Sequence, residues 1–267
     1  MGKKLGLIAG GGRLPSLVAE AAQENGYEVI GVAIEGEALP SLESAVDRLF
    51  WIRIGELDRM IRALKGEGVD QVVMVGKVQK RHIYSDIKPD LRAALLFFRL
   101  KERNDDAILK ALCQELEREG IEVVECTRLV SRLLAPQGVL TTLPSTPRQR
   151  ADIEFGRRMA KIVAGADIGQ TVVVKAGAVV AVEAIEGTNE AIRRGAELAG
   201  PGTVVVKVAR PQQYLRLDVP VVGPDTVEVM REVGASVLAL EAGRVIMVDR
   251  EEMVKIAKGG KISIVAD

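Results

Sequence analysis

The chain has 267 residues, 48% of them hydrophobic but only 3% aromatic, and its 37 Lys and Arg are balanced by 37 Asp and Glu. This charge balance excludes the strong basic field that non-specific nucleic-acid binding requires, so we expect no nucleic-acid partner. The length suggests two domains of roughly 130 residues each. Val, Ala, Leu and Ile dominate, as in buried parallel strands covered by helices, which indicates a soluble α/β protein.

Cysteine and histidine usage also limits the chemistry. Cys113 and Cys126 are the only cysteines and form no CxxC pair, so neither a disulfide framework nor a structural zinc site is indicated. His82 is the only histidine, and because no flanking pattern marks it as a catalytic base we interpret it as a loop residue. With no signal-peptide core and no run long enough to span a bilayer, we expect a cytoplasmic protein.

The first half of the chain alternates apolar runs with helical patterns, as expected for a doubly wound parallel sheet. Strands are predicted at residues 5–9, 29–34, 48–54, 71–75 and 121–124, and helices at 17–23, 57–64 and 104–119. Residues 93–98 are apolar on every helical face. This pattern favours a buried helix, with an acyl-chain or membrane-facing surface as the alternative.

A cluster of helix-breaking residues marks the middle of the chain. Several prolines and Gly138 stand among polar residues there, and such a stretch cannot continue a regular element. We therefore predict a first domain at residues 1–134, a linker at 135–147 and a second domain at 148–267.

The second half of the chain again mixes helices and strands. Helices are predicted at residues 148–163, 189–199, 226–232 and 251–258, and strands at 171–174, 178–182, 203–208, 236–240 and 245–248. The runs at 171–174 and 178–182 are joined by Lys175-Ala176-Gly177, which is typical of a hairpin. The second domain is therefore expected to be α/β with mixed strand direction.

A glycine run, Gly10, Gly11 and Gly12, follows the first predicted strand and opens a helix. Glycines in this position let backbone amides approach a phosphate, although a structural tight turn is the alternative. The spacing is not GxGxxG and there is no Walker lysine, which argues against dinucleotide and P-loop sites. Lys77, just past the strand at 71–75, would reach an anion at the carboxyl edge of the sheet unless it is only a solvated loop lysine.

Two polar stretches follow strand-like runs in the second domain. In one, Glu183 and Glu186 stand three apart, and in the other Asp218 lies beside Arg216. Carboxylates near a guanidinium suit metal-assisted phosphate chemistry, because Mg²⁺ takes oxygen ligands and arginine binds phosphate in bidentate fashion. The alternatives are surface ion pairs and, at Thr188, a plain helix cap.

Six segments that run in order along essentially the whole chain carry a family resemblance. They are Gly6 to Pro15, Gly76-Lys77-Val78, Asn104-Asp105-Asp106, Asp167-Ile168-Gly169-Gln170, Val182 to Thr188 and Arg216 to Gly223. Together they resemble the LpxI family, the UDP-2,3-diacylglucosamine pyrophosphatases of lipid A synthesis. The last two segments are more specific than any single glycine loop.

The resemblance implies an N-terminal Rossmann-like domain, a distinct C-terminal α/β domain, substrate between them, and a homodimer that exchanges domains. It implies Mg²⁺-dependent attack of water on the α-phosphorus of UDP-2,3-diacylglucosamine, which releases UMP and 2,3-diacylglucosamine 1-phosphate. The lipid-bearing substrate also implies peripheral contact with the cytoplasmic face of the inner membrane.

The resemblance further implies site residues. Asp218 is the expected catalytic acid, which would hold the metal or orient the water, and Arg216 would offset charge on the transferring phosphoryl group. The metal ligands are not identified. The other expected substrate-binding residues are Gly10, Gly11, Gly12, Leu14, Lys77, Gln170, Glu186, Gly187 and Thr188.

Two positions depart from the family pattern. Asn189 replaces the aspartate that usually follows Glu-Gly-Thr, and Tyr214 replaces the aspartate of a Lys-Pro-x-Gln-Asp motif. Each change removes a carboxylate, which weakens a metal site. The alternative functions are therefore a nucleotide or nucleotide-sugar binding protein without catalysis, and a hydrolase of a non-lipid UDP-sugar.

Overall fold

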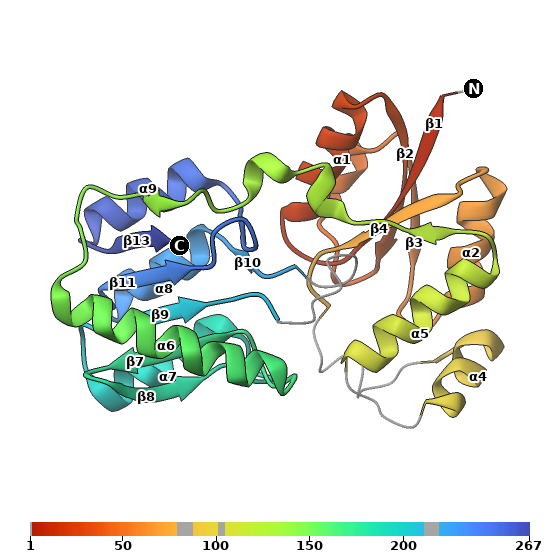
Figure 1. The fold of residues 1–267 in the computed structure, drawn as a ribbon. Coiled ribbons are helices and arrows are strands. Elements are labelled where there is room, and N and C mark those ends of the chain that lie inside the picture. The colour runs from red at the N-terminus through yellow and green to blue at the C-terminus, as the bar shows by residue number, and fades with distance from the viewer. Residues whose placement is uncertain (1, 79–87, 101–104, 211–218) are drawn as a thin grey trace. The chain divides into compact units, whose positions relative to one another are not determined.

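A computed structural model of the protein describes residues 2–78, 88–100, 105–210 and 219–267 (Figure 1). The described residues divide into two compact units, one within residues 2–131 and the other within residues 132–267. Each unit combines helices with a sheet of its own, parallel in the first unit and mixed in the second. The expected fold class, α/β with two domains, is confirmed.

The first unit contains a wholly parallel sheet in the order β3-β2-β1-β4-β5. The strands are β1 (Lys3–Ala9), β2 (Tyr27–Ile34), β3 (Arg48–Ile52), β4 (Gln71–Val75) and β5 (Glu122–Val123), and the helices are α1 (Leu14–Glu24), α2 (Leu57–Gly66), α4 (Leu91–Arg99) and α5 (Asp105–Arg118). Helix α1 covers one face of the sheet, while α2 and α5 cover the other (Figure 1). Because the strand order reverses between β1 and β4, their carboxyl ends form the topological switch point of a Rossmann-like sheet.

Burial on both faces explains why the strands of this sheet are apolar throughout. Leu7, Val29 and Val73 are fully buried, and Ile30 packs with the α2 residue Ile61 in the core on one face. Each such side chain contributes roughly 1.5–3 kcal/mol relative to an exposed one. The strands predicted in this half are therefore confirmed, with β3 ending at Ile52.

Helix α4 corrects the interpretation of residues 93–98. The helix forms, but Ala93 is its only buried residue, and Leu91, Leu95 and Phe98 are 77%, 47% and 88% exposed. The expectation of a buried helix is wrong, because only Ala93 and Leu96 contact the core of the unit and charged contacts supply much of the remaining attachment. Within the described ranges, no helix has both the length and the apolar character needed to cross a bilayer.

The second unit contains a mixed sheet in the order β6-β13-β11-β9-β7-β8 and a separate pair, β10 and β12. The strands are β6 (Gly138–Val139), β7 (Thr171–Lys175), β8 (Ala178–Val182), β9 (Val204–Lys207), β10 (Val221–Val222), β11 (Val237–Leu240), β12 (Ile246–Met247) and β13 (Ser263–Ala266), and the helices are α6 (Pro147–Gly165), α7 (Thr188–Ala199), α8 (Pro224–Glu232) and α9 (Arg250–Gly259). Strands β9, β11 and β13 are parallel to one another. Three pairs are antiparallel, which are β6 with β13, β7 with β9 and β7 with β8. Side chains of α6 pack on one face, and those of α7, α8 and α9 on the other.

The predicted hairpin is confirmed by the antiparallel pairing of β7 with β8. Its turn places Ala176 at φ 54° and Gly177 at φ 77°, the left-handed geometry that a tight hairpin turn requires. The buried carboxylate of Asp152 on α6 accepts hydrogen bonds from both turn amides, at 3.0 Å and 2.7 Å. One side chain therefore fixes the hairpin to the helix that covers it.

Strand β13 was not expected, because the sequence prediction ended with the helix at residues 251–258. It lies inside the sheet, parallel to β11 and antiparallel to β6. Strand β6 comes from residues 138–139, which were expected to belong to a linker. Ala135, from the same stretch, is 1% exposed in the core of the second unit. This part of the chain therefore contributes to the sheet and core of the second unit.

Candidate functional site

The first group of expected site residues lies at the switch point of the first unit. The glycines at 10–12 follow β1, and Lys77 follows β4, the neighbouring strand. Ligands of open α/β sheets bind outside the carboxyl ends of the strands at such a point. The fold thus brings these residues together at the edge of the sheet where a ligand is expected.

The two loops meet through their backbones. The amide of Gly10 donates to the carbonyl of Val75 at 2.8 Å, and Gly11 and Lys77 exchange amide-to-carbonyl hydrogen bonds of 2.7 Å and 3.0 Å. A Cβ at position 10 would lie 2.8 Å from the Lys77 carbonyl oxygen, and one at position 76 would lie 2.6 Å from the Gly10 carbonyl carbon. Glycine is therefore required for this close approach, and any ligand contact by Gly10 or Gly11 must use groups other than these amides.

The remaining expected residues of this unit differ in exposure. Gly12, at φ 90°, and Lys77 are exposed. Leu14 is only 6% exposed and begins α1, so its side chain packs in the core. The exposure of Lys77 suits both an anion-binding and a solvated lysine, and its role stays a prediction. His82 lies outside the described residues.

In the second unit, strand direction gathers polar residues at one edge of the sheet. Lys207 ends β9, and its register partner Thr171 begins the antiparallel β7. Strand β8 runs antiparallel to β7, so Glu183, just after β8, lies at the same edge and donates its amide to the Thr171 carbonyl at 2.9 Å. Thr188 begins α7. Residues from four elements therefore meet at this edge.

A buried charge cluster forms there, which we call the Lys207 cluster and define as Thr171, Glu183, Thr188 and Lys207. The side chains of Lys207 and Glu183 are only 6% and 13% exposed, with Nζ and Oε2 3.6 Å apart. The Thr188 hydroxyl donates to Glu183 Oε1 at 2.6 Å and accepts from Lys207 Nζ at 2.7 Å. Lys207 Nζ also donates to the Thr171 hydroxyl at 3.3 Å. The Thr188 hydroxyl is therefore held by both charges. The alternative of a plain helix cap at Thr188 is wrong, because the N-cap residue of α7 is Gly187 and no side chain caps the helix.

The cluster keeps Glu183 ionised. Burial raises the pKa of Glu183, but attraction to Lys207 and hydrogen bonds from Thr171, Thr188 and the Gln170 amide outweigh it, so the pKa lies below its ordinary value. An ionised Glu183 balances the ammonium group of Lys207. The described geometry thus fixes the start of α7 by a compensated pair of buried charges.

Gln170, an expected substrate-binding residue, lies beside this cluster. It is 9% exposed, its amide donates to Glu183 Oε2 at 3.3 Å, and its carbonyl accepts from the Val208 amide at 3.0 Å. A Cβ on the preceding Gly169 would lie 2.0 Å from the Glu183 carbonyl oxygen. The family-like segment ending at Gln170 therefore packs directly against the residue that follows β8.

Glu186 and Gly187 complete the group at the start of α7. Gly187 is the N-cap residue, at φ 86°, a conformation that favours glycine. Glu186 Oε1 accepts from Arg194 Nη2 at 2.5 Å, and the two side chains are 28% and 49% exposed. Glu186 thus forms a surface ion pair, which was one of the alternatives for the acidic residues. Glu183 instead forms a buried pair with Lys207.

Polar contacts also hold the chain just before residue 211. The Ala209 amide donates to Glu241 Oε2 at 2.8 Å, and Lys161 Nζ reaches the same oxygen at 2.6 Å. Arg210 pairs with Asp167 at 2.9 Å. The expected catalytic residue Asp218, together with Arg216 and Tyr214, lies outside the described residues.

The described residues do not fit a metal site. Among them, no group of three or more His, Cys, Asp or Glu is close enough to hold an ion. Glu183 and Glu186 are already paired with Lys207 and Arg194. Neither carboxylate is therefore available as a Mg²⁺ ligand in the described arrangement.

Lys207 was missed by the sequence analysis, although the sequence carries a signal for it. It is a single charge inside the apolar run at residues 203–208. A lysine within a strand that is otherwise buried must find partners there, because an unpaired buried ammonium is costly. Its partner Glu183 follows another apolar run, so the pair could have been suspected.

The parallel sheet with its switch point and the mixed sheet with its edge cluster define a two-domain α/β protein whose first domain is Rossmann-like. Both halves match one family: the LpxI N-terminal domain covers residues 4–133, and the LpxI C-terminal domain covers residues 136–265. The chain therefore belongs to the LpxI family.

A curated relative extends this finding over nearly the full length. UDP-2,3-diacylglucosamine pyrophosphatase LpxI of Caulobacter vibrioides is 34% identical over 268 aligned residues, which cover 96% of this chain and 94% of the relative. Among solved structures, N5-carboxyaminoimidazole synthetase from Staphylococcus aureus has 13% identity and a TM-score of 0.28 over 74% of this chain and 36% of its own. AtPrR2 has 10% identity and a TM-score of 0.29 over 99% and 80%. Scores this low support no conclusion about fold or function.

Proposed function

We propose that the chain hydrolyses the pyrophosphate bond of UDP-2,3-diacylglucosamine in a Mg²⁺-dependent reaction. Water attacks the α-phosphorus and loses a proton, and the bond from that phosphorus to the bridging oxygen breaks. The bridging oxygen leaves with 2,3-diacylglucosamine 1-phosphate, and the water oxygen remains on the phosphorus of UMP. Every atom of substrate and water is thereby assigned to a product.

One observation carries the proposal, which is the ordered match of the chain to both LpxI domains. The relative from Caulobacter vibrioides, 34% identical, has this activity in its name. Family membership places the chain among the pyrophosphate hydrolases. The identity of the sugar nucleotide is part of the proposal.

The proposal assigns the central roles to Asp218 and Arg216. Asp218 orients or deprotonates the attacking water, because an ionised carboxylate is a suitable base at neutral pH. Arg216 binds the phosphoryl oxygens in bidentate fashion and offsets the charge that develops on them. Both residues lie within the part of the chain that matches the LpxI C-terminal domain, and this match supports the assignment.

The other assigned residues bind the substrate. Gly187 and Thr188, at the start of α7, bind a phosphate of the substrate, since the amides and dipole of a helix N-terminus favour an anion. Lys77 offers a point charge at the edge of the first sheet. The remaining assigned positions are Gly10, Gly11, Gly12, Leu14, Gln170 and Glu186.

The proposed cofactor and partners rest on the family resemblance. A divalent ion generally offsets the charge of a diphosphate during hydrolysis. The described residues supply no ligand set for it, so we assign the ion no individual step. We further propose a homodimer that exchanges domains, located in the cytoplasm with peripheral contact to the inner membrane.

The test is incubation with UDP-2,3-diacylglucosamine and Mg²⁺, with UMP followed by chromatography. We expect UMP release that stops with EDTA and falls by about 10³-fold or more in Asp218→Ala, a loss typical for removal of a catalytic group. An unchanged rate in Asp218→Ala would remove the assigned mechanism. A parallel incubation with UDP-N-acetylglucosamine tests whether the acyl chains matter.

The competing function is nucleotide-sugar binding without turnover, motivated by Asn189 and Tyr214. Asn189 Oδ1 accepts a hydrogen bond from the Thr226 hydroxyl at 3.1 Å, an interaction that an aspartate would also accept. Asn189→Asp should therefore fold normally. If the original chain binds the substrate without releasing UMP and the variant Asn189→Asp with Tyr214→Asp releases it, the non-catalytic function is correct.

A further inference from the structure

Helix α4 exposes large apolar side chains that an ordinary surface helix would bury. Leu91, Leu95 and Phe98 recur at intervals of four and three residues and therefore share one side of the helix. They are 77%, 47% and 88% exposed. Surface helices normally turn charged residues to solvent and apolar residues inward. The outward side of α4 is apolar instead.

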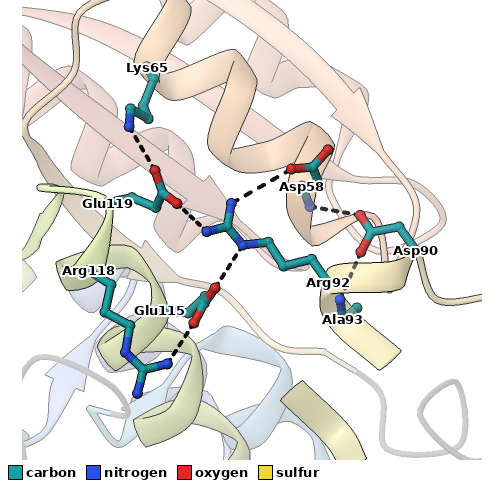
Figure 2. Close-up of polar contacts among 8 residues, drawn as sticks. All are labelled: Asp58, Lys65, Asp90, Arg92, Ala93, Glu115, Arg118 and Glu119. Carbon is teal, nitrogen blue, oxygen red and sulfur yellow. Dashed lines mark hydrogen bonds and ion pairs between the residues drawn. The ribbon is translucent and has the colours of Figure 1, made fainter. Parts of the chain in front are cut away.

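The opposite side of α4 is attached by charges, as Figure 2 shows. Arg92, only 26% exposed, donates to Glu115 of α5 at 2.7 Å, pairs with Glu119 just beyond α5, and lies 3.7 Å from Asp58 of α2. These four side chains form what we call the Arg92 network. The single guanidinium faces three carboxylates, but each of these is also paired with a further cation: Asp58 with Arg62, Glu115 with Arg118 and Glu119 with Lys65. Little net charge therefore remains beneath the helix.

The carboxylate of Asp90 fixes the start of the same helix. It accepts from the Ala93 amide at 2.8 Å, which caps α4, and from the Asp58 amide at 2.7 Å, in the first turn of α2 (Figure 2). Helix α4 is thus held on α2 and α5 by polar contacts, together with Ala93 and Leu96, which pack in or against the core of the unit. The exposed side chains of Leu91, Leu95 and Phe98 take no part in that core. Its large apolar side chains are not needed for that attachment and remain available to a partner.

Exposed arginines flank the apolar side. The groove beside α4 is lined by Leu91, Leu95 and Leu96 together with Arg99 and Arg118. The carboxylates that also line it, Asp58, Asp90 and Glu115, are already bonded to arginines or to backbone amides. Arg99 is exposed, and the side chain of Arg118 is 63% exposed. Apolar side chains next to exposed arginines complement a surface that offers hydrocarbon beneath anionic head groups.

We propose that the apolar side of α4 docks the protein on an anionic bilayer, with Leu91, Leu95 and Phe98 entering the acyl layer and Arg99 and Arg118 meeting lipid phosphates. This rests on the proposed function, since a substrate with two acyl chains resides in a bilayer. Docking through α4 brings the first unit to the surface that holds the substrate. The protein binds there without crossing the membrane.

The test is co-sedimentation with phosphatidylcholine vesicles, with and without phosphatidylglycerol. Leu91→Ser with Phe98→Ser should lower partition to the anionic vesicles by about tenfold or more, because two large apolar side chains no longer enter the acyl layer. The matched control is Ile162→Ser with Leu198→Ser, whose side chains are 64% and 70% exposed in the second unit. Equal partition of the two double variants, or no binding by the original chain, would overturn the proposal.

Two further measurements distinguish an anionic bilayer from other partners of the apolar side of α4. Arg99→Gln with Arg118→Gln should remove the preference for phosphatidylglycerol, as should high salt, because the charge contribution is screened. Sedimentation velocity without lipid tests the other occupant of such a surface, a second copy of the chain. A dimer that dissociates in Leu91→Ser with Phe98→Ser would overturn the proposal.

Failure of the proposed function would be visible separately. UMP release from substrate dispersed in detergent measures hydrolysis without a bilayer, and the α4 variants should keep the original rate there. Vesicle binding without UMP release would support the docking surface and contradict the proposed hydrolase activity. UMP release without vesicle binding would contradict the proposed docking surface and leave the proposed hydrolase activity standing.

Discussion

The Arg92 network and the Lys207 cluster use the same interaction in opposite surroundings. In the first unit, the side chains of Arg92, Glu115 and Glu119 are 26%, 15% and 25% exposed. In the second, those of Lys207 and Glu183 are 6% and 13% exposed. Water screens a partly exposed network, whereas a buried pair depends on every partner it has.

This difference suggests different duties for the two groups of charges. The Arg92 network attaches a helix and leaves that helix's other side free. The Lys207 cluster holds the Thr188 hydroxyl and the start of α7 within a sheet edge where the substrate is proposed to bind. Accordingly, we expect changes in the buried cluster to cost more than comparable changes in the network.

The largest effect is expected for Lys207→Met, which leaves the buried carboxylate of Glu183 without its cation. We expect the free energy of unfolding to fall by about 3–5 kcal/mol in urea denaturation. The control is Lys65→Met, because Lys65 pairs with Glu119 at 2.7 Å but is 49% exposed, and its loss should be below about 1 kcal/mol. Equal losses would contradict the contrast between the two regions.

A smaller effect is expected for Thr188→Val, which removes a hydroxyl that is bonded to both charges of the cluster. The loss should be about 1–3 kcal/mol, because Glu183 and Lys207 each lose a hydrogen-bond partner. Thr188→Ser keeps the hydroxyl and should recover most of that loss in the same denaturation experiment. If serine were no better than valine, the methyl group and not the hydroxyl would be the important part of Thr188.

In the first unit, Arg92→Gln should cost roughly 1 kcal/mol, since the network is partly exposed. Repeating the measurement in about 1 M NaCl should shrink this cost, because salt screens exposed charges. The cost of Lys207→Met should change much less under the same conditions. A salt-independent cost for Arg92→Gln would show that its contribution comes from packing.

The smallest expected effect is on the loss of folding stability at acidic pH. The pKa of Glu183 is lowered in the folded chain, so its stabilising contribution is complete above the ordinary value of 4.5 and is lost as pH falls through the folded value. Glu183→Gln should therefore lose less stability than the original chain as pH falls below 4.5. Glu119, whose pKa is lowered to about 2 by Lys65 and Arg92, should show a similar but salt-sensitive effect. Parallel acid slopes in the original chain and Glu183→Gln would contradict the account.

Much of the fold was predictable, because buried parallel strands are continuous apolar runs. The runs that became β1, β2 and β4 are of this kind, and Lys175-Ala176-Gly177 marked the hairpin. Strand β13 was missed, since a four-residue run after a helix gives no periodicity by which to recognise it. Strand β6 has only two residues and owes its existence to pairing with β13, a partner more than 120 residues away.

The site was predictable in part. The sequence marked Gln170 and Thr188, and the structure places both beside Glu183 at one edge of the sheet. Lys207 was overlooked, because only the antiparallel pairing of β7 with β9 brings it to Thr171. The apolar residues 93–98 led to the expectation that α4 is buried. The sequence does not reveal that the guanidinium of Arg92 points toward α5 and pairs with Glu115 there.

The position of β13 has a consequence for how the protein is made. The first sheet needs no strand beyond β5, which ends at Val123, so it can assemble early while the ribosome is still translating. The second sheet is different, because β13 is the one partner of β6 among the described strands and residues 263–266 emerge last. Until then, the edge of β11 stays open to neighbouring nascent chains. The second domain is therefore the more vulnerable one during synthesis, and shortening the chain by its last five residues should trap it in that state.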